Sequence, residues 1–179
     1  MQKINKLLNI LNTFLYLKNI KFIENKIRIN YPADINEIIN IRIGHKVTIK
    51  EWSWINTSKI KKKINLVIGN NTTIGRFCHI NALNFVSIGN NVLISDRVYI
   101  SDGSHNYKNV ELPINQQGIS RLFQVILEDG CWIGVGACIM PGVTIGKNSV
   151  ISANSVVTMD VPDNSVAGGN PAKIITVLN

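Results

Sequence analysis

Three histidines and three cysteines are the side chains of this sequence best suited to proton transfer or nucleophilic attack. They are His45, His79, His105, Cys78, Cys131 and Cys138. An imidazole with an ordinary pKa of about 6.5 can accept a proton from a hydroxyl at neutral pH, whereas a thiol needs a base and a lowered pKa. The cysteines form no CxxC pair and no metal-binding spacing, which is typical of reduced thiols in a cytoplasm. The elements that position these six residues decide which of them could act.

A six-residue repeat of aliphatic residues runs through most of the chain. Its positions are Ile43, Ile49, Ile55, Ile68, Ile74, Ile80, Ile88, Ile94, Ile100, Leu127, Ile133, Ile139, Ile145, Ile151 and Val157. A period of six fits neither an α-helix nor a simple hairpin, but it fits a short strand, a corner and another short strand. Three hexads then make one triangular coil, and coils stack at about 4.8 Å. The sequence therefore predicts an all-β fold, a parallel β-helix.

The residues that flank the aliphatic positions are also regular. Glycine often follows them, and we expect tight corners with positive φ at Gly44, Gly69, Gly75, Gly89, Gly134 and Gly146. Small or β-branched residues stand two places before them and should lie inside the column. Cys78 and Cys131 occupy that inner position, so we predict that they pack in the core. His45, His79 and Cys138 fall at outward positions inside regular hexads.

His105 lies where the repeat is interrupted. Ile100 is the last regular position before the interruption and Leu127 the first after it, and residues 103–124 show no six-residue phase. A long excursion from a compact repeat is usually a binding or catalytic loop. His105 is therefore the predicted catalytic residue.

Charge and composition restrict the partners. The net charge of +8 favours anionic partners. Aromatic residues make up only 7% of the chain and form no ladder with basic residues, which argues against nucleic acid. No run of eighteen apolar residues predicts a transmembrane helix. The basic run of Lys59, Lys61, Lys62 and Lys63 is interpreted as a solvated loop, or as a contact with an acidic acceptor or a membrane.

Residues 1–24 form a predicted amphipathic helix that precedes a β-helix domain at 25–179. The apolar residues at helical spacing are Ile4, Leu7, Leu8, Leu11, Phe14 and Leu15. One interpretation is that this helix packs on its own fold or on a neighbouring subunit. The other is a weak contact with a membrane surface through Lys3, Lys6, Lys18 and Lys21.

The segments IGVGACIMPGVTIGKNSVISANSVV and AGGNPAKII resemble the hexapeptide-repeat acyltransferases, in the branch of galactoside, maltose, streptogramin and polysaccharide O-acetyltransferases. The resemblance covers residues 40–179, and the C-terminal segment 163–179 closes the domain. It implies a left-handed β-helix, a homotrimer with active sites between subunits, and acetyl-CoA as co-substrate. No metal is implied.

The resemblance also implies roles for single residues. SDGSH matches the segment that carries a general-base histidine, although Gly103 replaces the first histidine of a D-H-x-H pattern. Asp102 or Glu111 could orient His105. The predicted substrate contacts are Asn81, Trp132 and Asp102. The predicted acetyl-CoA contacts are Trp132, Val135, Ala153, Thr158 and Lys173. Met159 stands where relatives often have a lysine, for which Lys147 is a substitute.

The leading hypothesis is an acetyl-CoA-dependent O-acetyltransferase that acts on a carbohydrate hydroxyl in surface polysaccharide synthesis. We expect it in the cytoplasm or at the inner face of the membrane. The alternatives are an N-acetyltransferase for an amino-sugar nucleotide and a xenobiotic acetyltransferase. Another class is a silent β-helix scaffold, or a zinc protein of the carbonic-anhydrase type. The zinc protein would need three clustered histidines, a pattern that the spacing of the histidines does not favour.

Overall fold

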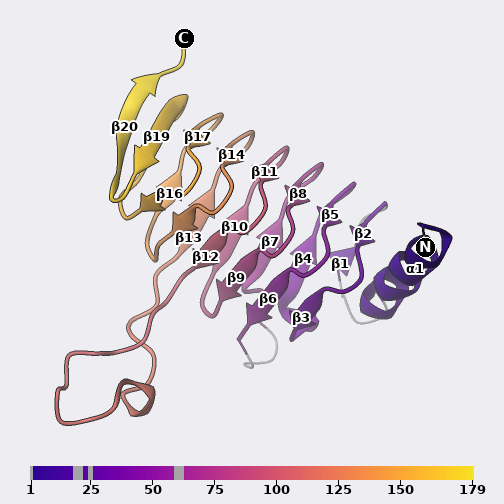
Figure 1. Ribbon diagram of the computed structural model, residues 1–179, viewed down its shortest axis with the longest axis horizontal. Coiled ribbons are helices and arrows are strands. Elements are labelled where there is room, and N and C mark those ends of the chain that lie inside the picture. Colours follow the sequence, from indigo (N-terminus) through magenta and orange to yellow (C-terminus); the bar gives the residue numbers. More distant parts are fainter. Residues whose placement is uncertain (1, 18–21, 24–25, 59–62) are drawn as a thin grey trace.

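Short parallel strands wind into a three-sided column, as Figure 1 shows. The structure is a computed structural model, and it describes residues 2–17, 22–23, 26–58 and 63–179. Five of the lysines considered above lie outside the described residues, namely Lys18, Lys21, Lys59, Lys61 and Lys62. Each turn of the column contributes one strand to each of three sheets, here called sheets A, B and C.

Neighbouring strands of a sheet come from successive turns of the column and pair in parallel, except for the antiparallel pair β19–β20. Sheet A contains β1 (Phe22–Ile23), β4 (Ile41–Ile43), β7 (Leu66–Ile68), β10 (Val86–Ile88), β13 (Val125–Leu127) and β16 (Thr144–Ile145). Sheet B contains β2 (Arg28–Ile29), β5 (Thr48–Ile49), β8 (Thr73–Ile74), β11 (Leu93–Ile94), β14 (Trp132–Ile133), β17 (Val150–Ile151), β19 (Ser165–Gly169) and β20 (Ala172–Val177). Sheet C contains β3 (Asp34–Asn36), β6 (Trp54–Thr57), β9 (His79–Ala82), β12 (Tyr99–Ser101), β15 (Cys138–Ile139) and β18 (Val156–Val157).

The core lies inside the column, as the repeat predicts. All fifteen aliphatic repeat positions are at most 1% exposed, and Cys78 and Cys131 are buried beside them. Polar residues at the inner small position bond to the backbone of the next coil. The Ser53 hydroxyl donates to the Gly75 carbonyl at 2.8 Å, and the Thr72 hydroxyl donates to the Gly89 carbonyl at 2.9 Å. The predicted parallel β-helix is therefore confirmed, and one further coil, β1 to β3, precedes Ile41.

The predicted reason for the corner glycines is wrong. The glycines that follow the aliphatic positions do not have positive φ, because that conformation belongs to the residue two places later, as at Asn71, Phe77 and Asn91. Glycine is required by the close approach of the next coil. A Cβ atom on Gly69 would lie 2.5 Å from the backbone carbon of Gly89.

Helix α1 (Gln2–Leu17) lies across the N-terminal end of the column, beside β2 (Figure 1). In the part of the chain that the structure describes, neither this helix nor any other has the length and apolar character needed to traverse a bilayer. A short 3₁₀ helix, η1 (Ile38–Asn40), precedes β4.

One long excursion leaves the column after β12 of sheet C and returns at β13 of sheet A. Figure 1 shows this excursion projecting away from the stacked coils. It contains the 3₁₀ helix η2 (Ile114–Gln116). Its two arms come together at the base, since the N–H of Phe123 donates to the carbonyl of Asp102 at 2.8 Å. The excursion therefore corresponds to the loop predicted at residues 103–124.

Candidate active site

His105 lies near the base of the excursion, where the two arms form a short antiparallel ladder. The N–H of Ser120 donates to the Ser104 carbonyl at 2.7 Å, and the N–H of Asn106 donates to the Gly118 carbonyl at 3.0 Å. These bonds flank the bridge between His105 and Ile119. The backbone of His105 is thus held on both sides while its side chain is exposed.

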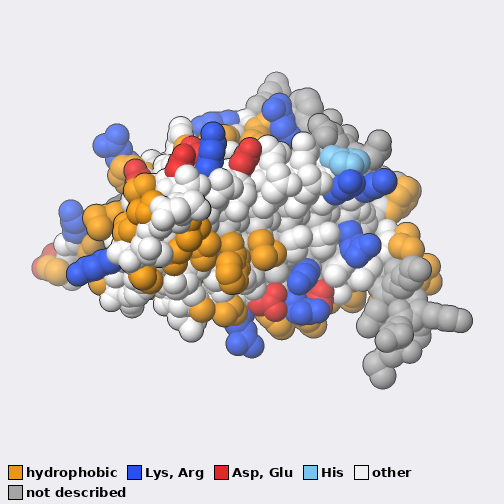
Figure 2. Space-filling model, turned by 90° about the horizontal axis from the view of Figure 1, so that it is seen from above, with side chains coloured by type: hydrophobic (Ala, Val, Ile, Leu, Met, Phe, Trp, Pro, Cys, Tyr) orange, Lys and Arg blue, Asp and Glu red, His pale blue; other side chains and the backbone are white. Residues whose placement is uncertain are grey.

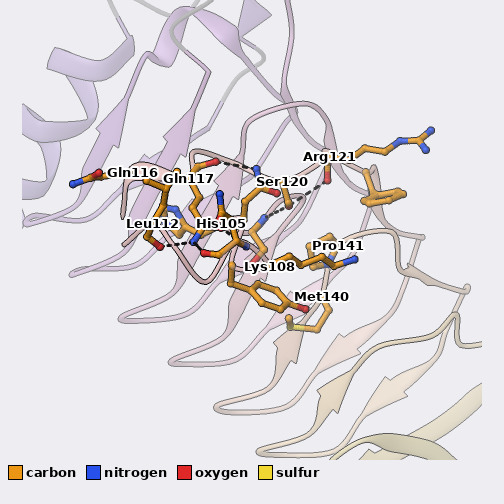
Figure 3. Close-up of a pocket in the computed structure, with 14 residues that line it drawn as sticks. His105, Lys108, Leu112, Gln116, Gln117, Ser120, Arg121, Met140 and Pro141 are labelled. Atoms are coloured by element: carbon orange, nitrogen blue, oxygen red, sulfur yellow. Dashed lines mark hydrogen bonds between the residues drawn. The ribbon is translucent and has the colours of Figure 1, made fainter. Parts of the chain in front are cut away.

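The excursion borders an open pocket of about 890 Å³ that His105 lines. Figure 3 shows Lys108 lying toward Met140 and Pro141, two residues of the neighbouring coil, whereas the side chain of Arg121 extends away from the pocket. The Arg121 guanidinium instead lies over the Phe123 ring, 5.4 Å from its centroid. The described residues that line the pocket include no acid. The local charge therefore suits a neutral or anionic acceptor.

Gln117 organises the tip of the excursion. Its amide nitrogen donates to the carbonyls of Asn109 at 2.7 Å and Leu112 at 2.8 Å, and its amide oxygen accepts the N–H of Asn109 at 3.1 Å. These bonds give the pocket its outer wall. The sequence does not single out Gln117, because an amide in a segment without periodicity gives no local signal.

Asp102 is fully buried at the base of the excursion. Its carboxylate accepts three backbone N–H groups, from Leu83 at 3.0 Å, Asn84 at 2.6 Å and Phe85 at 2.8 Å. Burial raises the pKa of the Asp102 carboxyl, and the three N–H donors oppose that rise. The side chain is directed into turn 83–85 of the preceding coil instead of the pocket. We therefore assign Asp102 a structural role in place of the direct substrate contact predicted above.

Asn65 holds the same turn from the other side. Its buried side-chain amide donates to the carbonyls of Leu83 at 3.2 Å and Asn84 at 2.7 Å. Turn 83–85 is therefore held from both sides. The Asn65 amide of the coil before it donates to its carbonyls, and the Asp102 carboxylate of the coil after it accepts its N–H groups. Glu111, the other residue considered for orienting His105, is exposed and does not line the pocket.

Asn81 lies on the outer face of sheet C, in register with Asn56 and Ser101. Its amide oxygen accepts a bond from the Asn56 side chain at 3.2 Å, and its amide nitrogen lies 3.3 Å from Nε2 of His79. His79 packs between Trp54 and Tyr99, with ring centroids 4.1 and 5.3 Å away, and burial lowers its pKa. Asn81 thus belongs to a half-buried polar and aromatic row, and acceptor binding by it stays a prediction.

The residues predicted to contact acetyl-CoA lie on the C-terminal coils. Trp132 projects from the outer face of sheet B, is 48% exposed, and donates from its indole N–H to the Ser95 hydroxyl at 3.0 Å. Val135 and Ala153 occupy exposed corners of successive coils, and within the described residues their backbone N–H groups donate no hydrogen bond. Thr158 and Lys173 are also exposed. An exposed ring, two available N–H groups and a cation fit a pantetheine arm and its phosphates.

Trp132 and His105 lie on different sides of one chain. The excursion leaves at the edge between sheets C and A, and its pocket is completed by Met140 and Pro141, which follow β15 at that same edge. Trp132 belongs to sheet B, the side of the column opposite this edge. A single chain therefore does not bring Trp132 and His105 together, whereas Thr158 follows β18 at the same edge as Met140.

The alternative zinc hypothesis requires metal-binding side chains that lie close together. In the described part of the chain, no three His, Cys, Asp or Glu side chains gather closely enough to hold a metal ion.

Comparisons with known proteins place the fold in a family. Residues 124–159 match the family model described as the hexapeptide repeat of succinyl-transferase. The chain is 32% identical over 157 residues to the galactoside O-acetyltransferase of Escherichia coli, covering 84% of this chain and 73% of that protein. It is 38% identical over 94 residues to the galactoside O-acetyltransferase of Lactococcus lactis, covering 52% of this chain and 44% of that protein.

Other comparisons cover less of the relative or support the fold only. For curated relatives from two yeasts and Mycobacterium tuberculosis, the match spans 44%, 42% and 45% of their length, so the chain spans less than half of these proteins. The crystal structure of the N-acyltransferase AntD from Bacillus cereus has a TM-score of 0.79 at 20% identity, over 94% of this chain and 88% of that one. The extended likeness to the Escherichia coli galactoside O-acetyltransferase and the hexapeptide match show that the chain belongs to the hexapeptide-repeat acyltransferases.

Proposed function

We propose that this chain is an acetyl-CoA-dependent O-acetyltransferase that acts on a carbohydrate hydroxyl in surface polysaccharide synthesis. The observation that carries the proposal is the exposed imidazole of His105, which lines a pocket where the repeat opens. His45 and His79 lie in regular coils away from this pocket. The names of the galactoside O-acetyltransferase relatives support a sugar hydroxyl as the acceptor.

His105 would act as the general base. It takes the proton of the acceptor hydroxyl while the hydroxyl oxygen attacks the carbonyl carbon of the acetyl thioester. The C–S bond then breaks, and the proton passes from His105 to the leaving thiolate, so that the products are an acetyl ester and a free thiol. A general base of this kind contributes about 10²–10⁴-fold to the rate.

The pocket offers two features suited to a sugar. Tyr107 lines it and is 67% exposed, so its flat ring is available to the apolar face of a pyranose. Lys108 supplies a positive charge that would favour an acidic sugar or a phosphate on the acceptor.

Acetyl-CoA would supply the activated acetyl group. Trp132, Val135, Ala153, Thr158 and Lys173 of a neighbouring subunit would hold it along the C-terminal coils. A cyclic homotrimer is the closed symmetry that would bring this wall to the His105 pocket of each chain. The proposal places the enzyme on the cytoplasmic side, where acetyl-CoA is available.

The test measures transfer of acetyl groups from acetyl-CoA to a panel of carbohydrates. The free thiol that each transfer releases reports the rate. We expect His105→Ala to lower turnover by at least ~100-fold, because the hydroxyl loses its base. Isothermal titration should show unchanged binding of acetyl-CoA, since His105 is assigned to the acceptor proton. His45→Ala is the matched control, because His45 stands in a regular coil, and we expect it to retain full activity.

Unchanged turnover in His105→Ala would remove this residue from the mechanism. Transfer to amino-sugar nucleotides, but to no hydroxyl acceptor, would replace the O-acetyltransferase by the N-acetyltransferase alternative. Absence of acetyl-CoA binding in the wild-type protein would favour the silent scaffold.

A further inference from the structure

Helix α1 is attached to the column through its polar face. The Asn9 side-chain oxygen accepts the N–H of Tyr31 at 2.8 Å, the Thr13 hydroxyl accepts the N–H of Ile29 at 2.9 Å, and the Tyr16 hydroxyl donates to the Ala33 carbonyl at 2.8 Å. Burial raises the pKa of Tyr16, and its bond with the N–H of Ile35 opposes that rise. The side chains of Asn9, Thr13 and Tyr16 thus bind the first coil.

This attachment has a clear physical reason. The strand β2 is the first strand of sheet B, so one of its edges has no neighbouring strand. Unpaired backbone groups at a sheet edge are a site of aggregation unless another element covers them. The polar side chains of α1 bond to these backbone groups and cap the column.

The apolar face of α1 is consequently turned outward. Leu7 is 68% exposed, Ile10 59% and Leu11 51%. Phe14 and Leu15 continue the same face and are more than half exposed. A soluble amphipathic helix normally places its apolar stripe against the core. Here the stripe is presented to the surroundings, which indicates that a further surface covers it.

Charge indicates what that surface is. Residues 1–63 contain thirteen of the 19 basic residues and four of the 11 acidic residues, for a net charge of +9, whereas the rest of the chain has −1. No acidic residue occurs before Glu24. Lys26 and Arg28, next to α1, are exposed, and Figure 2 shows Lys and Arg side chains spread over the visible face, its N-terminal end included. The exposed apolar stripe thus lies at the strongly basic end of the molecule.

From this arrangement we infer that α1 docks on the surface of an anionic lipid bilayer, with its axis along the membrane and its apolar face inserted among the acyl chains. An apolar stripe combined with a basic surrounding is the pattern of helices that lie in the interface of anionic membranes. A second copy of the chain fits less well, because an end-to-end contact would bring two basic ends together. This inference does not depend on the proposed acetyl transfer.

The experiment measures co-flotation of the whole protein with vesicles. One set contains phosphatidylcholine alone, and the other contains phosphatidylcholine with phosphatidylglycerol at a ratio of about 7:3. We expect binding to the anionic vesicles that weakens as salt increases, because salt screens the attraction between lysine and lipid headgroups. The neutral vesicles should bind at least tenfold more weakly.

Two variants address the two parts of the surface. Leu7→Ser with Leu11→Ser removes apolar area that is already exposed, so the fold should persist while vesicle binding falls at least tenfold. Lys3→Glu with Lys6→Glu should abolish the preference for anionic vesicles. Ile175→Ser with Val177→Ser is the matched control, because these residues are 63% and 61% exposed on β20 at the other end of the column, and we expect unchanged binding.

Three outcomes would overturn the inference. Equal binding of the wild type to neutral and anionic vesicles would exclude recognition of anionic lipid. Equal loss of binding in the β20 control would show that no particular face is used. Absence of vesicle binding, together with a smaller assembly for the Leu7 and Leu11 variant in light scattering, would show that a second copy covers α1.

Discussion

Asp102 is a buried carboxylate that holds two segments of the chain together beside the predicted catalytic loop. Its side chain fixes turn 83–85 of the preceding coil, and its backbone carbonyl accepts the N–H of Phe123 at the end of the excursion. His105 is only three residues away. Asp102 thus fixes the base of the excursion that carries the imidazole.

We predict that Asp102→Asn destabilises the fold. An amide in this place can offer only one oxygen, and its nitrogen would face backbone N–H groups. Hydrogen bonds to charged groups contribute about 1.5–3 kcal/mol each, so losing one or two of them should lower the free energy of unfolding by about 2–4 kcal/mol. Urea unfolding followed by circular dichroism measures the change.

Asp129→Asn is the matched control. The carboxylate of Asp129 accepts the N–H of Asn90 at 2.7 Å, and one coil earlier Asn90 itself accepts the N–H of Asn70 at 2.8 Å. An asparagine therefore already performs this function at the equivalent position. We expect a change below about 0.5 kcal/mol for the control, and equal losses in the two variants would contradict the special role of Asp102.

The position of His105 could be predicted because the repeat defines which residues are regular and therefore which one is not. The role of Asp102 could not, because its three bonds reach residues 17 to 19 positions earlier in the chain. A one-dimensional pattern does not specify which side chain turns toward the coil below. Resemblance suggested substrate contact for Asp102, and the burial of its side chain argues against that contact.

The excursion is an element whose base is packed tightly at Gly103. A Cβ atom at this position would lie 2.4 Å from Cδ2 of Leu122 on the returning arm. The φ of Gly103 is not positive, so the close contact with the end of the Leu122 side chain, not backbone conformation, is what a larger residue would meet here.

We predict that Gly103→Ala and Leu122→Ala are coupled. The single Gly103→Ala variant should lose about 0.5–1.5 kcal/mol of stability, because the end of the Leu122 side chain has to leave its rotamer. Leu122→Ala frees the space, so the double variant should be more stable than the sum of the single effects by about 0.5–1 kcal/mol. A double-mutant cycle in urea measures this coupling, and strict additivity would show that the loop arms accommodate the extra methyl group without strain.

The sequence predicted the coils well because each one repeats the same inner pattern. The first coil follows the same six-residue pattern, since Ile29 and Ile35 are six residues apart and each is followed by asparagine. The sequence does not distinguish the two possible causes of the corner glycines, because close approach of two backbones and positive φ select the same residue type. The periodicity of residues 1–24 predicts a helix but not its orientation. A hydrophobic pattern does not show which face of the helix will bind the open edge of β2.

At the scale of the whole molecule, three regions are distributed along and around the column. Helix α1 covers the N-terminal end, with its apolar face outward and basic residues around it. The His105 pocket lies at the edge between sheets C and A, and the residues proposed to bind acetyl-CoA lie on the C-terminal coils. If α1 rests on a membrane, the active sites lie above it at the level of the fourth and later coils. A lipid-linked sugar chain could reach a pocket at that height.

The placement of the two half-sites leads to a prediction for mixed assemblies. His105→Ala should be inactive because it lacks the base, and Trp132→Ala should be weakly active because it lacks part of the donor wall. Suppose that each site combines the pocket of one subunit with the wall of its neighbour. Co-expression of the two variants in equal amounts should then restore about a quarter of the wild-type activity. The reason is that, in randomly assembled trimers, about a quarter of the interfaces pair an intact pocket with an intact wall. Differently tagged chains allow the mixed trimers to be isolated, and light scattering confirms their size. Mixed trimers without recovered activity would show that each chain carries a complete site, for which the excursion would have to fold back across the column toward sheet B.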